Sequence, residues 1–214
     1  TQLKEKGALG IGWVVAFPQP DRFGGDEAFK QSLEDIPSVL AMFEGDNALY
    51  PNTTGTVILG EDVGGTPAAG VIQNIDLFKQ SSQQGIAVAR TEVDSLIRRL
   101  PLLLRTPDGW VPAYGTEVLK ILVGADTYVI KTNDNGLEEI RVRGLPPVPV
   151  DSLGRKWISF VNTPHTNLKD MDVQNKFVFI GYTAKGIMPQ LATPVGLLEP
   201  HMIQASLAES ILIE

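Results

Sequence analysis

The 214-residue sequence predicts an α/β fold with a mixed, largely parallel sheet flanked by helices and with inserted β-hairpins. Apolar runs near both ends do not alternate with polar residues, which is typical of strands covered on both faces. The order strand, helix, strand around these runs favours parallel crossover units. Turn-forming residues in the middle of the chain separate short strands without helices between them, which indicates hairpins.

The first forty-odd residues predict a helix end, a buried strand, a helix and a second strand. Gly7 lies near the end of a short helix, and the apolar run at residues 11–17 predicts a strand stopped by the prolines that follow. Asp26 is placed to cap the next helix, whose apolar residues recur four positions apart. Residues 38–43 predict the second strand.

The central part of the chain contains a loop-rich stretch followed by a stretch of predicted strands and a helix. Residues 45–85 are rich in Gly, Asn, Thr, Ser and Gln and predict loops around one strand at 56–59. The following stretch predicts a strand, a turn with an acidic tip, another strand and a tight turn at 107–109. A helix with one apolar face is then expected at 112–123.

The segment "TYVIKTNDNGLEEIRVRG" at 127–144 is the clearest hairpin in the chain. Its Asn135-Gly136 pair supplies the positive φ angles that a tight hairpin turn requires. A second turn at 151–154 precedes a strand at 157–161.

The C-terminal part predicts a last strand at 177–180 and a last helix at 199–212. Pro200 fits the first helical position, where its missing N–H costs nothing. Because no repeat, linker or charge block divides the sequence, we expect a single domain over residues 1–214.

The composition excludes several classes of function. The chain has 18 basic and 25 acidic residues, a net charge of −7, so a nucleic acid would meet net repulsion without a basic patch. The absence of cysteine excludes disulfides, thiolate zinc sites and a cysteine nucleophile. No stretch approaches the roughly 18–20 apolar residues that span a bilayer. The sequence therefore resembles an excised globular piece with no nucleic-acid partner.

The turn after the last strand has the elements of an anion cradle. Gly181, Thr183 and Gly186 could direct backbone N–H groups toward a ligand, with the cation of Lys185 beside them. The spacing matches part of a P-loop but fails beyond Gly186, where Pro189 appears and no helix starts. These four residues are the candidate ligand site, and a purely structural turn is the alternative.

A basic pair extends this candidate site. Arg98 and Arg99 point to opposite faces if they lie in a strand, so at most one can share a pocket with the turn. We include Arg98 in the ligand-binding set.

Other chemistries find no support in the sequence. His165 and His201 lack a second histidine at metal-ligand spacing, and His201 is expected on the surface of its helix. A calcium loop fails because Lys131 and Val142 occupy the places of carboxylates. No Gly-x-Ser-x-Gly elbow is present. We therefore predict no catalytic residue, no metal and no cofactor, while a carboxylate pair assembled in space stays open.

Three stretches carry a resemblance to a known family. Residues 177–196 match a strand followed by Ile-Gly-x-Thr-Ala-x-Gly and then Thr-Pro-x-Gly, and residues 98–103 match Arg-Arg-x-Pro-Leu-Leu. Residues 149–155 are similar to Pro-x-Asp-x-x-Gly-Arg. On these residues the chain resembles the second type of CHASE domain, extracellular sensory domains associated with cyclases and histidine kinases.

The sequence also departs from the family pattern. Val14 stands where the family often has an acidic residue, and Met188-Pro189-Gln190 stands where an aspartate is common. If those carboxylates contact a ligand, this member takes a different ligand or none. The opening strand and most of the first helix of the pattern are expected to precede Thr1.

The resemblance implies an extracytoplasmic, periplasmic sensory module of an integral membrane protein. Transmembrane helices outside this sequence would connect it to a cytoplasmic adenylate or guanylate cyclase or a histidine kinase, and the fragment itself would not be an enzyme. The stimulus would be an unknown small molecule or a physical signal, and a homodimer is compatible with this scheme. Two alternatives stay open: a soluble α/β binding protein or enzyme using the Gly181–Gly186 turn, and a dimerisation spacer without a ligand.

Overall fold

A five-stranded sheet organises the part of the chain that the computed structural model describes, which is residues 2–46, 49–160, 164–165, 171–184 and 186–213. Its central strands run in the order β14, β1, β2, and both β5 and β6 pair with β2. The strands are β1 (Gly10–Trp13), β2 (Ser38–Glu44), β5 (Val71–Ile72), β6 (Gln83–Ile86) and β14 (Phe177–Ile180).

This sheet is largely parallel, as the sequence predicts. Strand β1 pairs in parallel with β14 on one side and with β2 on the other, and β6 continues the parallel order. Strand β5 pairs antiparallel with the end of β2. The central residues of β2 from Val39 to Ala41 have no exposed surface, which explains their uninterrupted apolar character.

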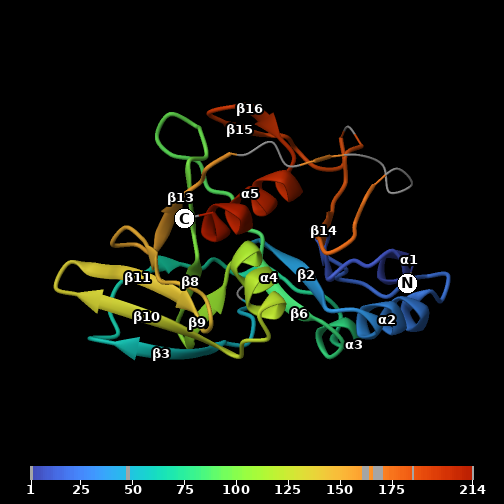
Figure 1. Ribbon diagram of the computed structural model, residues 1–214, viewed down its shortest axis with the longest axis horizontal. Helices are drawn as coiled ribbons and strands as arrows, with labels where there is room; N and C mark the ends of the chain where they lie inside the picture. Colours follow the sequence, from blue (N-terminus) through green and yellow to red (C-terminus); the bar gives the residue numbers. More distant parts are fainter. Residues whose placement is uncertain (1, 47–48, 161–163, 166–170, 185, 214) are drawn as a thin grey trace.

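Within the described ranges, five helices accompany the strands: α1 (Gln2–Glu5), α2 (Asp26–Asp35), α3 (Asp76–Lys79), α4 (Tyr114–Leu122) and α5 (Pro200–Leu212). Figure 1 shows α1, α2 and α3 at one end of the molecule and α4 and α5 in its middle. Edge-to-face contacts of Phe29 with Trp13 and Phe78, at 5.1 Å between ring centroids, attach α2 and α3 to the sheet.

A second sheet forms the opposite end of the molecule (Figure 1) and contains the predicted hairpin. Its strands, in spatial order, are β12 (Val148–Pro149), β11 (Gly136–Val142), β10 (Thr127–Asn133) and β3 (Gly55–Leu59). The hairpin turn pairs Asn133 with Gly136, and Gly136 has a φ of 117°. Asn135 does not share the positive φ that the sequence suggested for both residues.

A three-stranded sheet and two strand pairs complete the described architecture. The sheet contains β4 (Thr66–Pro67), β8 (Leu103–Thr106) and β9 (Gly109–Pro112). The pairs are β7 (Arg99–Pro101) with β13 (Arg155–Trp157) and β15 (Leu191–Thr193) with β16 (Gly196–Leu198). The strand predicted at 157–161 thus lies earlier, at Arg155–Trp157, and residue 161 is outside the described part of the chain. Glycine at position 154, with a φ of 78°, closes the turn predicted before it.

Two predicted boundaries are wrong for identifiable reasons. Strand β1 ends at Trp13 rather than Phe17, because the Phe17 amide donates to the Asn74 side chain at 2.7 Å instead of to a strand. The helix expected from residue 112 starts at Tyr114, because β9 pairs with β8 as far as Pro112.

The predicted cap of α2 is also wrong. Asp26 is the first helical residue, and Gly25 occupies the N-cap position. The Asp26 carboxylate accepts the Asp21 amide, and the Asp21 carboxylate accepts the Gly25 amide at 2.8 Å. These two aspartates therefore organise the turn before the helix rather than its first amides.

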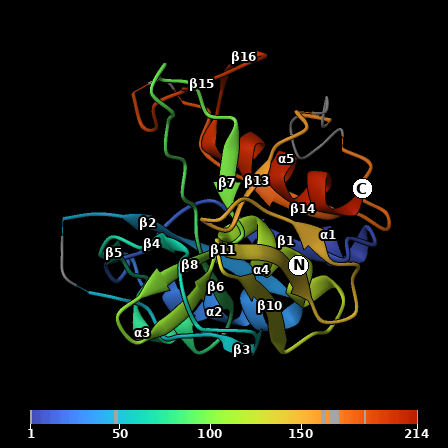
Figure 2. The same cartoon turned by 90° about the vertical axis from the view of Figure 1, so that its left-hand side faces the viewer.

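Helices α4 and α5 meet at close range in the middle of the molecule, with α5 above α4 in both ribbon views (Figures 1 and 2). Glycine at position 115 allows this approach, since a Cβ atom there would lie 2.9 Å from the Gln204 carbonyl oxygen. Ile203 and Leu207 of α5 are fully buried in the largest apolar core. Because α4 also packs on β2 and β6, it connects the main sheet to the last helix.

Candidate functional site

The predicted ligand turn follows β14 and lies on the surface. Thr183 and Gly186 are exposed, and the backbone closes the turn on itself through the Ile187 amide and the Ala184 carbonyl at 3.2 Å. Lys185 lies outside the described residues. The ligand-binding role of Gly181, Thr183, Lys185 and Gly186 therefore stays a prediction.

Arg98 binds carboxylates of its own loop. Its guanidinium donates to Asp94 at 2.6 and 2.8 Å and to Glu92 at 3.4 Å. Arg98 lowers the pKa of Asp94 to about 2, so this carboxylate stays ionised at neutral pH. An anionic ligand would have to compete with both acids, and the role proposed for Arg98 also stays a prediction.

Gly181 has a clear structural role. A Cβ atom at this position would lie 2.5 Å from Nδ1 of His201, so only glycine lets the backbone after β14 approach that ring so closely. His201 is 6% exposed, which corrects the expectation of a surface histidine. Its Nδ1 has no hydrogen-bond partner within the described residues, and its ring lies 5.6 Å from that of His165.

The buried His201 makes stability depend on pH. Burial, followed by the neighbouring His165, lowers the pKa of His201 below its ordinary 6.5, and Glu199 opposes this in part. The unfolded chain therefore takes up a proton at a higher pH than the folded chain, so folding stability falls as the pH drops through 6.5 toward the lowered pKa. Urea unfolding at about pH 7.5 and about pH 5.5 measures the loss.

His201→Gln removes this titration and should flatten that pH dependence, whatever its effect on absolute stability. His165→Gln retains the buried ring of His201 and should keep a reduced pH dependence, because burial is the larger cause of the lowered pKa and His165 the smaller one. Equal pH dependence in the wild type and in His201→Gln would contradict the assignment.

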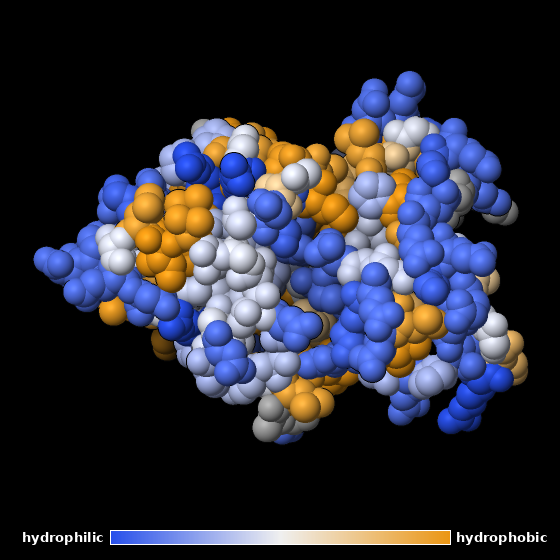
Figure 3. Space-filling view, turned by 90° about the horizontal axis from the view of Figure 1, so that it is seen from below, coloured by the Kyte–Doolittle hydropathy of each residue, from blue (hydrophilic) through white to orange (hydrophobic). Residues whose placement is uncertain are grey.

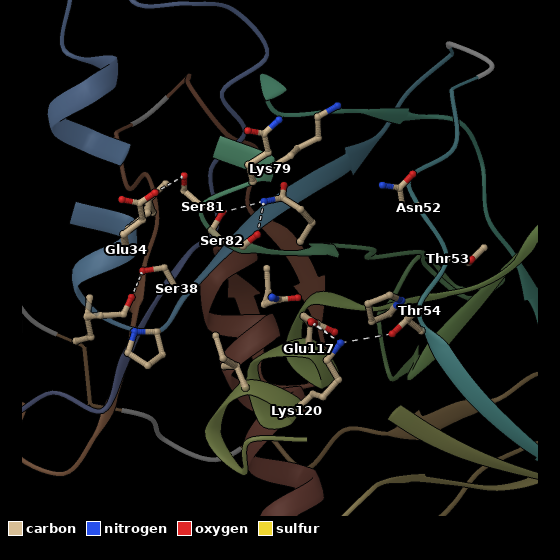
Figure 4. Close-up of a pocket in the computed structure, with 18 residues that line it drawn as sticks. Glu34, Ser38, Asn52, Thr53, Thr54, Lys79, Ser81, Ser82, Glu117 and Lys120 are labelled. Atoms are coloured by element: carbon tan, nitrogen blue, oxygen red, sulfur yellow. Dashed lines mark hydrogen bonds and ion pairs between the residues drawn. The ribbon is translucent and has the colours of Figure 1, made fainter. Parts of the chain in front are cut away.

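A polar cleft of about 660 Å³ lies elsewhere, at the amino ends of β2 and β6 (Figure 4). Ligands of open parallel sheets usually bind beyond the carboxyl ends of the strands, so this cleft lies at the opposite edge. The ends of α2 and α3 form one wall, the 52–54 segment forms the other, and α4 borders the cleft. None of the described residues predicted to bind a ligand lines it.

A buried ion pair of α4 faces this cleft. The Lys120 ammonium lies 2.8 Å from a Glu117 carboxylate oxygen, and the two side chains are 10% and 1% exposed. The other Glu117 oxygen accepts the Tyr128 hydroxyl at 2.6 Å. Burial, reinforced by Glu117, raises the pKa of Tyr128 well above its usual range, so the phenol remains a donor. The Lys120 ammonium also reaches the Thr54 hydroxyl at 3.4 Å.

Hydroxyl and amide groups line the cleft beside apolar and charged side chains. On one side the Ser81 hydroxyl donates to Glu34 at 3.1 Å, and the Gln84 amide donates to the Ser82 hydroxyl at 2.9 Å. Asn52 and Thr54 lie across from them (Figure 4). Seen from below, hydrophilic and near-neutral residues occupy the middle of the molecular face, and apolar areas lie around them (Figure 3).

One signal in the sequence could have pointed here. Residues 80–84 read Gln-Ser-Ser-Gln-Gln, five neutral polar residues that lead into the buried second half of β6. Such a run at a strand entrance indicates a polar surface at that edge of the sheet. No comparable signal distinguishes Glu117 and Lys120, because an i, i+3 pair is ordinary on an exposed helix face.

A metal site is not assembled by the residues that the structure describes. No group of three or more His, Asp or Glu side chains among them could hold an ion. Among the described carboxylates, Glu138 pairs with Lys131 and Asp172 pairs with Lys176, so each has a cation as its neighbour.

Comparison with known proteins gives one match. The family model described as the CHASE2 domain matches residues 1–214, the whole chain. No curated protein and no solved structure matches the chain. Within the described ranges, every helix is too short or too polar to cross a bilayer. The resemblance inferred from the three sequence stretches is confirmed.

Proposed function

The chain belongs to the CHASE2 domain family, extracellular sensory domains of signalling receptors, and from this membership we propose that it receives the stimulus of a membrane-bound receptor. Domains of this family are sensory rather than catalytic, so we assign no reaction to the fragment. The receptor would carry a cytoplasmic adenylate or guanylate cyclase or a histidine kinase, reached through transmembrane helices that adjoin this domain.

The match over the whole chain carries this proposal, and the last helix supports it. Ten of the thirteen residues of α5 are buried, including Gln204, Ser206 and Ser210. The Gln204 amide donates to the Val88 carbonyl at 3.0 Å, while its oxygen has no partner among the described residues. A helix enclosed with incompletely paired polar groups is suited to two packings of similar free energy.

Signal transmission requires that the stimulus favour one of two packings of α5. A ligand with equal affinity for both would shift nothing. Because α4 packs against α5 through Gly115, a displacement of α4 is the most direct route to such a change.

A topology measurement on the complete receptor tests this function. Fusion at residue 214 should give active alkaline phosphatase, which folds only outside the cytoplasm, and no fluorescence from a green fluorescent protein fused at the same position. Fusions to the predicted cytoplasmic output domain serve as controls and should give the reverse pattern. Fluorescence from the residue 214 fusion would place the domain in the cytoplasm and refute the proposal.

A further inference from the structure

We infer that the cleft at the amino end of the main sheet binds a small uncharged molecule rich in hydroxyl groups, such as a monosaccharide or cyclic polyol. Its volume of about 660 Å³ lies within the range of small-molecule sites. A six-carbon sugar is much smaller than this space and could be enclosed together with bridging waters.

The chemistry of the walls selects neutral polar ligands. The cleft is lined by nine neutral side chains that can form hydrogen bonds: Ser38, Asn52, Thr53, Thr54, Gln80, Ser81, Ser82, Gln83 and Gln84. Hydroxyl and amide groups both donate and accept hydrogen bonds, which matches the dual character of sugar hydroxyls.

Several of these groups have hydrogen-bonding capacity to spare. Asn52, Gln80 and Gln83 are exposed, and their side chains have no hydrogen-bond partner within the described part of the chain. Asn52 belongs to one segment and Gln80 and Gln83 belong to another, so a ligand between them could be held from two sides. Gln84 is different, because its side-chain oxygen already accepts the Asn74 amide at 2.5 Å and its side-chain nitrogen donates to the Ser82 hydroxyl.

The charges of the cleft disfavour ionic ligands. Two carboxylates, Glu34 and Glu117, and two ammonium groups, Lys79 and Lys120, line it, so they leave no net charge. Glu117 and Lys120 neutralise each other at 2.8 Å, and Lys79 pairs with Asp76 at 2.7 Å. An anionic ligand would find no uncompensated cation among these groups and would lose hydration without compensation, and a cation would meet only the Glu34 carboxylate, which already accepts the Ser81 hydroxyl.

The apolar part of the lining disfavours flat aromatic ligands. It consists of Leu33, Ile36, Pro37, Pro112 and Ile121, and no aromatic side chain lines the cleft. Stacking on a ring is therefore not available, and aliphatic contacts fit the C–H faces of a sugar or polyol.

Helix α4 gives this site a route to α5. Its Glu117, Lys120 and Ile121 line the cleft, while Gly115 contacts α5 at Gln204 and Leu207. A ligand bound in the cleft would thus contact the same helix that packs on α5. This coupling step rests on the proposed sensory function, whereas binding itself does not.

Calorimetric titration of the 214-residue chain tests the inference. The neutral probes are D-glucose, D-galactose, D-ribose and myo-inositol, and gluconate and glucosamine are charged counterparts of glucose. We expect saturable binding of at least one neutral probe at millimolar concentration or below, and binding of gluconate and glucosamine about tenfold weaker than that of the best neutral probe.

Two variants locate the site. Asn52→Ala and Gln83→Ala each remove an exposed amide and should weaken binding about tenfold without changing the urea midpoint. Gln31→Ala, an exposed amide on α2 outside the cleft, should change neither. The inference is overturned if none of the four neutral probes binds, if a charged counterpart binds more tightly, or if both variants bind like the wild type.

These outcomes are independent of the receptor topology. A chain that binds no polyol can still give the extracytoplasmic fusion pattern, and then only the ligand assignment fails. If the fusions indicate a cytoplasmic position and the chain still binds a polyol, the sensory role is refuted and the ligand site stands.

Discussion

Replacing Glu117 with alanine is expected to destabilise the domain by about 3–5 kcal/mol, because it leaves the Lys120 ammonium buried without its counter-charge. The Tyr128 hydroxyl, which donates to Glu117 at 2.6 Å, loses its acceptor at the same time. Of the remaining contacts of Lys120, the Thr54 hydroxyl at 3.4 Å is too distant to compensate. Urea unfolding at neutral pH, followed by circular dichroism, measures the change.

Two further variants separate burial from charge. Glu138→Ala removes the partner of Lys131 in an ion pair of similar length, 3.0 Å, whose side chains are 42% and 43% exposed, and should cost less than about 1 kcal/mol. The double variant Glu117→Gln with Lys120→Met removes both charges and keeps an acceptor for Tyr128, so it should regain most of the loss. Equal effects of Glu117→Ala and Glu138→Ala would contradict the buried pair.

Gly85→Ala is expected to destabilise the domain by about 1–3 kcal/mol or more, because the added methyl group has no room. Its Cβ atom would lie 2.6 Å from Cα and 3.1 Å from the amide nitrogen of Tyr114. These are backbone atoms at the start of α4, so no side-chain rotation relieves the overlap. Either β6 or α4 must shift, and both are buried at this point.

Thermal and urea unfolding of Gly85→Ala measure this effect. Gly25→Ala is the matched control, because its Cβ atom would meet only the Asp21 carboxylate oxygen, 2.9 Å away at the end of an exposed side chain. We expect the control to lose a few tenths of a kcal/mol. A loss at Gly85 no larger than at Gly25 would show that α4 is not held against β6 as closely as described.

The elements that depend on residues adjacent in the sequence could be predicted from the sequence. The unbroken apolar run of β2, the turn glycine of the β10–β11 hairpin and the proline that opens α5 each define their element locally. The parallel order of the main sheet followed from the strand, helix, strand sequence at the N-terminal end.

Boundaries set by distant partners could not be predicted. Phe17 leaves the strand for Asn74, which is 57 residues away, and Pro112 belongs to a strand because β8 pairs with it. The same applies to the contact between Gly181 and His201. The closeness of His201 requires a glycine at position 181, and no local pattern indicated that this histidine is buried.

The sequence alone determined the family, the fold class and the absence of cysteine chemistry, because each depends on residue types and their order. Only the tertiary structure decided where polar groups from distant segments gather. It brings Asn52, Gln83 and Glu117 from three segments to the border of one cleft, and it buries His201 beneath a strand end. Hydrogen bonding and charge compensation act between neighbours in space, and spatial neighbourhood across such sequence distances arises only when the chain folds.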